Sequence, residues 1–434
     1  MKAVILAAGK GKRLRPITST RPKPMIPLAG KPLLEHTIIG LREASIQEIL
    51  LIVGYKEEII KNYFKDGSKF GVKIKYITQE EYLGTAQAAS LAKEFVNEDT
   101  FLMVYGDLLV DSLVFQSLIN KFAKYSCQGV ICLKEVPNPK DYGIVSLDTK
   151  GYMVKIIEKP SMEANLGNLV NAGIYLFSPI IFEAIKKTKK SSRNEFEFTE
   201  SMEILIKEMN GKIQSYVLLD EYWNDIGLPW QILDANQFLL NNLQSDLKGE
   251  IEDQVKIKGN VYIGENSKIL AGSYIQGPCF IGKNNLIGPN AFIRPYTSIS
   301  DDCHIGISEI KNTLIFSKTA VPHFNYIGDS IICENVNLGA GTKVSNLRFD
   351  NKNVNMIIDG KSLDSKRRKL GAIIGPNSQT GINVSIMCGK IIGEGSVIGA
   401  HTIVNENIEP NTLYYQDTNG KRIIKKNPFW GEKG

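Results

Sequence analysis

Side chains suited to phosphate chemistry follow the first apolar segment of this 434-residue chain. Gly9 and Gly11 alternate with lysines and lead into Arg13. Glycines at the end of a strand let backbone N–H groups approach a phosphate, and clustered cations offset its charge. Leu14 stands where a dinucleotide fingerprint needs its third glycine, and no Gly-Lys-Ser/Thr of a Walker loop follows. The segment therefore predicts a phosphate-binding loop of another kind.

Lys23 and two aspartates extend this chemistry. Lys23 lies between Pro22 and Pro24, which hold the chain in a stiff loop and can aim one ammonium group at a fixed point. Asp107 follows an apolar run, and Asp225 follows Trp223-Asn224 far along the chain. Two carboxylates suit an oxygen-ligand site for Mg²⁺ that bridges phosphates. Transfer at a phosphorus atom needs positioning and charge cancellation, and no protein nucleophile is required.

The elements that must position these residues alternate in residues 1–243. Apolar runs predict buried parallel strands, and amphipathic runs predict crossover helices, so we expect a doubly wound, Rossmann-like α/β domain with its ligand site at the carboxyl ends of the strands. The expected strands are 4–6, 48–53, 100–105 and 129–133, and the expected helices are 32–44, 56–64, 85–95, 113–125 and about 230–243. Residues 244–254 are expected to be a linker.

From residue 255 the apolar period changes to six. Nine isoleucines follow one another at this spacing, and the count resumes after two shifts: Ile257, Ile263, Ile269, Ile275, Ile281, Ile287, Ile293, Ile299 and Ile305. A prism with three short strands per turn places one such side chain on each face. The sequence therefore predicts a left-handed parallel β-helix of hexapeptide repeats over 255–410. Residues 351–370 break the period and predict a protruding loop, and 411–434 predict a basic carboxy-terminal tail.

Composition narrows the class of protein. The chain is 43% hydrophobic and 23% charged, which is typical of a folded globular protein. A net charge of +6 without a dense basic stripe suits phosphorylated small molecules rather than nucleic acid. No apolar run is long enough for a membrane span, and the amino terminus lacks a secretory signal, so we expect a cytoplasmic protein. The six cysteines include no Cys-x-x-Cys pair, which argues against disulfides and structural zinc.

The stretch from Leu6 to Pro16, with Arg21-Pro-Lys-Pro24, resembles the signature of sugar-1-phosphate nucleotidylyltransferases. The resemblance implies that the glycine-rich loop and Arg13 bind the nucleoside triphosphate and that Lys23 reaches the α-phosphate and the sugar phosphate. It also implies a pyrimidine-reading segment near residue 80, which favours UTP or dTTP. The implied nucleotide-binding residues are Leu6, Ala8, Gly9, Gly11, Gln79, Gly84 and Thr85, and the implied Mg²⁺ ligands are Asp107 and Asp225.

Three later stretches resemble the sugar-binding segments of that family. They are Tyr142-Gly-Ile-Val145, Ile157-Glu-Lys-Pro160 and Asn171-Ala-Gly173. The resemblance implies that Glu158 and Asn171 bind sugar hydroxyls and that Lys159 binds the sugar phosphate, with Gly143 lining the site.

A histidine marks possible second chemistry in the hexapeptide region. The chain has four histidines, and His323 lies where the hexad phase is reset, in a stretch that packing does not require. Histidine titrates near neutral pH, so it suits a general base that removes a proton as an amine attacks a thioester. This stretch resembles the catalytic segment of bifunctional, archaeal-type enzymes that N-acetylate glucosamine 1-phosphate with acetyl-CoA before nucleotidyl transfer.

The same resemblance implies an acceptor site and a homotrimer, or a dimer of trimers, with each site between neighbouring columns. The implied acceptor-binding residues are Arg294, Lys311, Tyr326, Asn337, Asn346 and Lys352. Gly381 and Ala400 are acetyl-CoA candidates by their position in late coils. Asn346 is followed by Leu-Arg-Phe rather than the Tyr-Asp-Gly of bacterial relatives, so galactosamine 1-phosphate stays open as an acceptor.

Three hypotheses follow for the whole chain. The leading one is a bifunctional enzyme that acetylates glucosamine 1-phosphate and joins the product to UMP from UTP, which gives UDP-N-acetylglucosamine and pyrophosphate. The second is a monofunctional glucose-1-phosphate thymidylyl- or uridylyltransferase whose β-helix only oligomerises. The third, a non-catalytic assembly subunit, fits poorly because the set Arg13, Lys23, Asp107 and Asp225 is complete.

Overall fold

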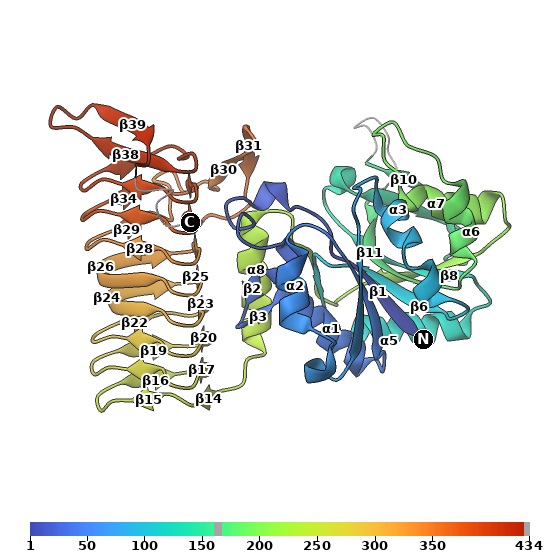
Figure 1. The fold of residues 1–434 in the computed structure, drawn as a ribbon, viewed down its shortest axis with the longest axis horizontal. Coiled ribbons are helices and arrows are strands. Elements are labelled where there is room, and N and C mark those ends of the chain that lie inside the picture. Colours follow the sequence, from blue (N-terminus) through green and yellow to red (C-terminus); the bar gives the residue numbers. More distant parts are fainter. Residues whose placement is uncertain (160–166, 429–434) are drawn as a thin grey trace. The chain divides into compact units, whose positions relative to one another are not determined.

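A computed structural model describes residues 1–159 and 167–428 of the chain (Figure 1). The chain forms two compact units, and each is described by itself. The first unit contains Met1–Lys10, Pro22–Met25 and Leu33–Asp225, and the second contains Gly11–Arg21, Ile26–Pro32 and Ile226–Gly434. The expected linker at 244–254 therefore lies inside the second unit, and the limits of the functional domains stay a prediction.

A mixed β-sheet forms the centre of the first unit. Its strands run in the order β10-β9-β11-β6-β1-β4-β5, and β8 and β12 extend it beside β11. Their bounds are β1 (Lys2–Leu6), β4 (Glu48–Val53), β5 (Lys73–Thr78), β6 (Phe101–Tyr105), β8 (Gly129–Glu135), β9 (Gly143–Leu147), β10 (Met153–Glu158), β11 (Leu169–Phe177) and β12 (Ile213–Leu218). Strand β1 is parallel to β4 and β6, as predicted.

The four predicted strands, β1, β4, β6 and β8, run in one direction as expected, but the sheet also contains antiparallel strands that were not predicted. Strand β8 is parallel to β12 but antiparallel to β11, which is also antiparallel to β6. Strands β9 and β10 follow each other without a helix and pair antiparallel, because a short connection reverses the chain direction, whereas parallel neighbours need a longer crossover connection. Four short strands lie outside this sheet. Strand β7 (Leu108–Val110) pairs with β13 (Trp223–Asp225), and β2 (Pro27–Leu28) pairs with β3 (Lys31–Pro32).

The helices follow the predicted spans closely, with one split. The expected helix at 85–95 is two helices, α3 and α4, and helices α6 and α7 were not predicted. The bounds are α1 (Leu33–Glu43), α2 (Glu57–Phe64), α3 (Thr85–Ser90), α4 (Lys93–Val96), α5 (Leu113–Lys124), α6 (Ile181–Lys187), α7 (Phe198–Lys207) and α8 (Pro229–Asn241), the last in the second unit. No helix within the described ranges is both long and apolar enough to cross a membrane.

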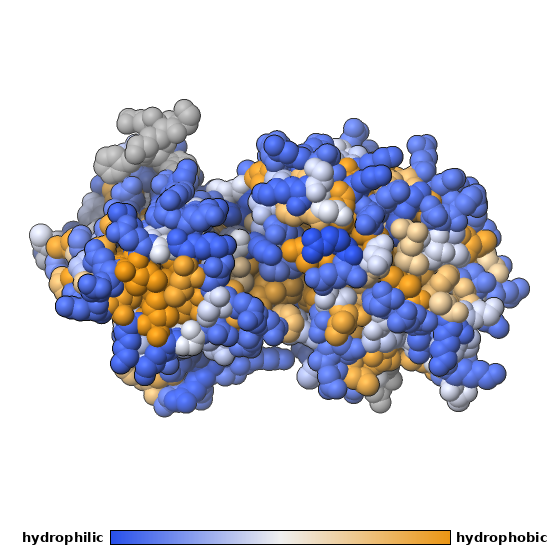
Figure 2. Space-filling model, turned by 90° about the horizontal axis from the view of Figure 1, so that it is seen from below, coloured by the Kyte–Doolittle hydropathy of each residue, from blue (hydrophilic) through white to orange (hydrophobic). Residues whose placement is uncertain are grey.

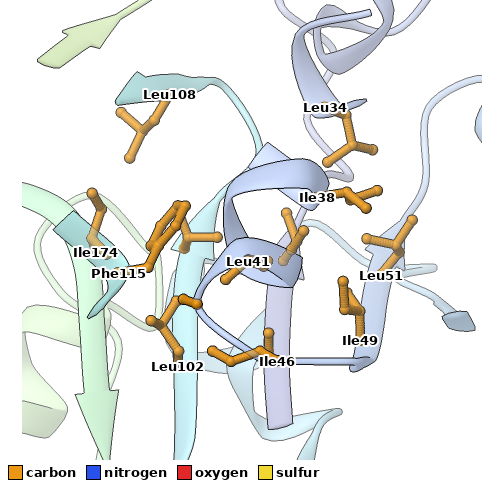
Figure 3. Close-up of a cluster of buried hydrophobic side chains, with 14 of the residues drawn as sticks. Leu34, Ile38, Leu41, Ile46, Ile49, Leu51, Leu102, Leu108, Phe115 and Ile174 are labelled. Atoms are coloured by element: carbon orange, nitrogen blue, oxygen red, sulfur yellow. The ribbon is translucent and has the colours of Figure 1, made fainter. Parts of the chain in front are cut away.

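Helix α1 shows how the sequence covers the sheet. Leu34, Ile38 and Leu41 share one helical face and point toward the strands in Figure 3, where Ile49 and Leu51 of β4 meet them. All five side chains are fully buried. Burial of each is worth roughly 1.5–3 kcal/mol relative to exposure, so this face fixes the helix on the sheet and the carboxyl ends of its strands in place.

The second unit is a parallel β-helix, the predicted fold class. One face consists of β14 (Asp246–Leu247), β17 (Val261–Ile263), β20 (Cys279–Ile281), β23 (Thr297–Ile299), β25 (Leu314–Ile315), β27 (Ile331–Ile332), β32 (Ile373–Ile374) and β35 (Ile391–Ile392). The other two faces contain β15 (Glu250–Ile251), β18 (Lys268–Ile269), β21 (Leu286–Ile287), β24 (His304–Lys311), β26 (Ala320–Gly328), β28 (Asn337–Leu338), β33 (Gln379–Thr380), β36 (Val397–Ile398), β16 (Lys256–Lys258), β19 (Tyr274–Gln276), β22 (Phe292–Ile293), β29 (Lys343–Val344), β34 (Ser385–Ile386) and β37 (Ile403–Val404).

The hexad isoleucines form the core of this unit. Ile263 to Ile305 are completely buried at every sixth position, whereas Ile257 in the opening coil is only partly covered. Strand register stacks Ile257, Ile275 and Ile293 directly on one another. The opening coil also leaves Leu247 and Ile251 exposed. Figure 2, seen from below, shows apolar surface gathered at this end of the β-helix.

Asparagines mark one corner of the β-helix. Asn266 and Asn284 occupy the left-handed backbone region, and Asp302 adopts the same conformation 18 residues later. Each amide donates to the side chain one coil onward, Asn266 to Asn284 at 3.3 Å and Asn284 to Asp302 at 3.0 Å. Asparagine and aspartate tolerate this conformation better than other residues with side chains, so the corner fixes the 18-residue repeat.

The β-helix extends beyond the predicted 255–410 on both sides. Strands β14 and β15 belong to it at the start, and β38 (Thr412–Gln416) stacks on β36 at the end and pairs with β39 (Arg422–Lys426). Tyr414 is fully buried in the core, so most of the expected basic tail is ordered, and residues 429–434 lie outside the described residues. The predicted loop 351–370 is an excursion that contains a hairpin, β30 (Asn355–Ile358) and β31 (Lys361–Asp364).

Candidate functional site

In the first unit Lys23 joins the two predicted metal ligands. Its Nζ lies 2.6 Å from Oδ2 of Asp107 and 3.7 Å from Oδ1 of Asp225. The antiparallel pairing of β7 and β13 sets Asp225 opposite Leu108, the neighbour of Asp107. Lys23 is buried, whereas the two aspartates keep 36% and 27% of their side chains exposed. The carboxylates are therefore close together and partly open to a ligand.

The two carboxylates of Asp107 and Asp225 are oxygen donors of the kind that a divalent cation takes. Carboxylate oxygens are the ligands that Mg²⁺ prefers, and it commonly uses one or two of them together with substrate phosphates. Within residues 1–159 and 167–428 no group of three or more His, Cys, Asp or Glu side chains could hold a metal ion, and this site too offers only two carboxylates. The donor set of Asp107 and Asp225 thus fits a cation that arrives with a polyphosphate.

The carboxyl end of β1 lies at the centre of the sheet. Gly106 donates its N–H to the carbonyl of Leu6 at 2.9 Å, and Tyr55 donates to the carbonyl of Ala8 at 3.1 Å. Gly9 is exposed, and the space beside its α-carbon is open. Leu6, Ala8 and Gly9 therefore occupy the edge of the sheet where doubly wound folds bind their ligands.

Gly11 and Arg13 belong to the second unit. Gly11 has a φ of 57°, and Thr18 donates its hydroxyl to the Gly11 carbonyl at 2.8 Å, which closes the loop on itself. Arg13 is exposed. A β-carbon on Gly227 would lie 3.0 Å from the guanidinium of Arg13, so glycine at that position leaves room for it.

Arg21 secures the end of the same loop within the second unit. Its Nη2 lies 2.5 Å from Oε2 of Glu334, and its guanidinium lies 4.8 Å from the ring centre of Phe316. The ion pair and the ring together hold an otherwise mobile arginine.

The predicted base-reading residues lie together at the end of β5. Gln79 is buried and donates its side-chain amide to Gln87 at 2.7 Å. Gly84 has a φ of 121°, and a β-carbon there would lie 2.4 Å from the Phe196 carbonyl, so only glycine fits. Thr85 accepts the N–H of Phe198 at 2.9 Å, which commits its hydroxyl oxygen to the start of α7.

Gly143 and Glu158 are directly opposite each other in β9 and β10. A β-carbon on Gly143 would lie 2.9 Å from Oε2 of Glu158, so the glycine gives the carboxylate its space. Burial raises the pKa of Glu158, although Lys159 and Arg193 oppose that shift. Lys159 follows in a left-handed conformation with a φ of 43°, and Pro160 of the same motif lies outside the described residues.

Asn171 is held by its own strand. Its Nδ2 donates to the Tyr175 hydroxyl at 2.8 Å, and its Oδ1 accepts the Gly173 N–H at 3.0 Å. Tyr175 in turn donates to the Tyr105 hydroxyl at 3.1 Å, and burial raises the pKa of both tyrosines. Asn171, the residue predicted to bind a sugar hydroxyl, is therefore held by a hydrogen-bonded pair of tyrosines.

In the β-helix, β24 and β26 place the predicted histidine. Their parallel pairing sets Ile307 beside His323 and Glu309 beside Tyr326. His323 is exposed, and burial together with the nearby charge of His323 lowers the pKa of His304 one coil earlier. Two histidines therefore lie near each other on one face.

Four of the six residues predicted to bind the acetyl acceptor form ion pairs or side-chain hydrogen bonds with their neighbours. Arg294 pairs with Glu309 at 2.7 Å. Lys311 lies 3.1 Å from Oδ2 of Asp329, and Asn346 donates to the Tyr326 hydroxyl at 3.2 Å. The other two, Asn337 and Lys352, are exposed.

The predicted acetyl-CoA residues lie in a column of small residues. A β-carbon on Gly381 would lie 2.5 Å from the nitrogen of Ala400, and one on Gly339 would lie 2.5 Å from the carbonyl of Gly381. Successive coils therefore approach closely here and leave no room for larger side chains. This arrangement does not test acetyl-CoA binding, which stays a prediction.

Several residues of both sites were not predicted from the sequence. Tyr105 adjoins the Gly106-Asp107 pair, a position that could have drawn attention to it. Arg193, which lies 3.6 Å from Glu158, and Asp329 belong to no motif that distinguishes them. Their roles depend on strand neighbours far away in sequence, so periodicity carries no signal for them.

Comparison with known proteins matches both parts of the chain. The nucleotidyl transferase family model matches residues 2–242, and a GMPPB C-terminal domain model matches residues 275–362. "Bifunctional protein GlmU" of Methanocaldococcus jannaschii is 46% identical over 96% of this chain and 98% of its own. A "bifunctional sugar-1-phosphate nucleotidylyltransferase/acetyltransferase" of Sulfurisphaera tokodaii is 43% identical over 94% of this chain and 98% of its own.

A solved structure agrees with the amino-terminal match. A putative glucose-1-phosphate thymidylyltransferase from Bacillus anthracis superposes with a TM-score of 0.51 at 28% identity and covers 57% of this chain and 97% of its own. The chain therefore belongs to the nucleotidyl transferase family and, over nearly its whole length, to the family of bifunctional GlmU proteins.

Proposed function

We propose that this chain is a bifunctional enzyme of nucleotide-sugar synthesis. It N-acetylates glucosamine 1-phosphate with acetyl-CoA and then transfers UMP from UTP to the product, which gives UDP-N-acetylglucosamine and pyrophosphate. The observation that carries the proposal is that both sets of side chains are present and assembled. Lys23 contacts Asp107 and Asp225 in one unit, and Asn346 contacts Tyr326 in the other.

In nucleotidyl transfer the sugar phosphate is the nucleophile. One of its oxygens forms a bond to the α-phosphorus of UTP as the bond to the pyrophosphate oxygen breaks. Asp107 and Asp225 would hold Mg²⁺, which supplies cancellation of charge on the phosphates when it is bound. Lys23 contributes a fixed positive charge for the α-phosphate, and Arg13 contributes one for the triphosphate.

In acetyl transfer the amine of glucosamine 1-phosphate forms a bond to the thioester carbonyl carbon, and the bond to the CoA sulfur breaks. His323 takes the proton that the amine loses. Lys311 and Arg294 are cations suited to the sugar phosphate, and Tyr326 and Asn346 are suited to the hydroxyls. The CoA thiolate takes that proton from the protonated His323 and leaves as the thiol.

Assembly through the β-helix is part of the proposal. Ile307, Phe324, Leu347 and Phe349 are apolar side chains exposed around the acetyl-transfer residues. Ile307 pairs with His323 in the strand register, Phe324 follows His323, and Leu347 follows Asn346, and exposed apolar side chains that gather on a surface are typical of interaction sites. We propose that they meet a neighbouring column in a homotrimer or a dimer of trimers, and light scattering of the purified chain tests this. A cytoplasmic location stays a prediction.

Replacement of His323 by Ala tests the two activities separately. The proposal expects acetyl transfer to fall by about 10²–10⁴-fold, because a general base is lost, while pyrophosphate release from UTP and N-acetylglucosamine 1-phosphate persists. A monofunctional transferase would show no acetyl transfer in the unaltered chain. The assay should pair UTP and dTTP with glucose, glucosamine, galactosamine and N-acetylglucosamine 1-phosphates, with and without acetyl-CoA, because it then also settles substrate preference.

A further inference from the structure

Asp329 is a buried carboxylate beside the proposed acetyl-transfer site. Only 3% of its side chain is exposed. It lies just after β26 in a left-handed conformation with a φ of 53°. Its N–H donates to the Lys311 carbonyl at 2.9 Å, and its carbonyl accepts the Gly371 N–H at 2.8 Å. The backbone therefore fixes where this side chain begins.

The carboxylate gathers three donors from two separate parts of the β-helix, Lys311-Asn312 and Asn346. Oδ1 accepts from Nδ2 of Asn312 at 2.7 Å, and Oδ2 accepts from Nδ2 of Asn346 at 2.6 Å. Nζ of Lys311 lies 3.3 Å and 3.1 Å from the two oxygens. Nδ2 of Asn346 also donates to the Tyr326 hydroxyl at 3.2 Å, so both of its hydrogens are used.

Burial explains why this arrangement holds its members firmly. An ionised carboxylate away from water is costly unless charge and hydrogen bonds compensate it, and Asp329 obtains one ammonium and two amide donors. If one of these partners moved away, the buried carboxylate would lose part of the compensation for its lost hydration, so the partners are held in place. Lys311, by contrast, keeps 21% of its side chain exposed and retains donor capacity toward a ligand.

We infer that Asp329 is a positioning residue of the acetyl acceptor site, an inference that rests on the proposed function. It sets the ammonium of Lys311 and the amide of Asn346, with Tyr326, in the arrangement that receives an amino-sugar 1-phosphate. It touches no substrate itself. Its contribution is to the binding of the acceptor rather than to the proton transfer at His323.

Gly328 belongs to the same arrangement. A β-carbon there would lie 2.6 Å from Nδ2 of Asn346 and 2.9 Å from the Tyr326 hydroxyl. Both contacts are shorter than side chains tolerate, so either the amide or the hydroxyl would have to move. Gly328→Ala therefore disturbs the positions of Asn346 and Tyr326 without changing any charge.

The test is the kinetics of Asp329→Asn in the full-length enzyme, with glucosamine 1-phosphate and acetyl-CoA as substrates. The new side chain turns its NH2 group toward the donor of either Asn312 or Asn346, so one of these two hydrogen bonds is lost, and Lys311 is left without its counter-charge. We expect KM for glucosamine 1-phosphate to rise by about 10- to 100-fold, with kcat changed by less than about threefold. Asp302→Asn is the matched control, an exposed aspartate in the same backbone conformation on an earlier coil, and its KM should match the unaltered enzyme.

Each outcome decides something. If the unaltered enzyme transfers no acetyl group, the proposed function fails, whatever the variants do. If it does and Asp329→Asn keeps the same KM, or loses only kcat, the positioning role is wrong. The rate of nucleotidyl transfer and the midpoint of thermal unfolding, measured on the same sample, show whether the variant is folded. Should Asp329→Asn fail to fold, Gly328→Ala decides, because a raised KM supports the inference and an unchanged KM overturns it.

Discussion

Asp107 and Asp225 leave 36% and 27% of their side chains exposed and share one lysine, whereas Asp329 leaves 3% exposed and accepts hydrogen bonds from two amides as well as a lysine. The first arrangement suits carboxylates that must exchange a protein cation for a metal ion and a polyphosphate. The second suits a carboxylate whose partners must stay where they are. Within one chain, burial distinguishes the carboxylates proposed to bind a metal ion from the one proposed to position other side chains.

Asp107→Asn should have the largest effect, because it removes charge from the exposed pair. We expect the kcat of nucleotidyl transfer to fall by about 10²–10³-fold, which corresponds to several kcal/mol of lost charge stabilisation, while acetyl transfer continues. A chelator should separate the two activities in the same way. Asp220→Asn, an exposed aspartate five residues before Asp225, serves as the control. If Asp107→Asn transferred nucleotidyl groups as fast as the unaltered enzyme, Asp107 would not be a ligand of the catalytic metal ion.

The next effect is on stability and concerns the column that holds the acetyl-transfer residues. Ile287→Ala should destabilise the β-helix by about 2–5 kcal/mol, because the inward side chain is fully buried and leaves a cavity. Leu286→Ala changes the outward neighbour in the same strand and should cost under about 1 kcal/mol. Chemical denaturation of both variants measures the difference, and equal losses would contradict the inward assignment of the hexads.

Lys23→Met tests whether the exposed aspartates bind a metal ion. In the unaltered chain the ammonium of Lys23 would compete with a metal ion for both carboxylates, and methionine removes that competitor. We expect Mg²⁺ to bind about three- to tenfold more tightly in the absence of nucleotide, while nucleotidyl transfer slows. Calorimetric titration with Mg²⁺ checks the first part and pyrophosphate release checks the second. Weaker Mg²⁺ binding in Lys23→Met would mean that the two aspartates are not the ligands.

The smallest expected effect is on pH dependence. Burial raises the pKa of Glu158, so this carboxylate takes up a proton at higher pH than an ordinary glutamate. If the carboxylate binds sugar hydroxyls, KM for the sugar phosphate should rise as pH falls toward the raised pKa. The same shift means that the folded state loses stability as pH rises through that range. Glu158→Gln should show a higher KM that does not change over this pH range. If KM of the variant changed with pH as it does in the unaltered enzyme, Glu158 would be excluded as the titrating group.

Local signals in the sequence were sufficient for the fold class, and they singled out Lys23, Asp107 and Asp225, which the structure brings together. The period of six predicted the β-helix because one inward position recurs on each face. The glycine-rich loop, Lys23 and Asp107 lie beside recognisable strand ends. The antiparallel strand β11, which lies between β6 and β8, was not predictable in this way, since an apolar run does not reveal which neighbour it will pair with.

What the sequence alone determined was which side chains are available and which face of each repeat is apolar, because those properties depend on residue type and spacing along one chain. What only the tertiary structure decided was which charges share a partner. Lys23 meets aspartates 84 and 202 positions further on, and Asp329 meets Asn346 by coil stacking, because chain folding and not local preference sets those distances.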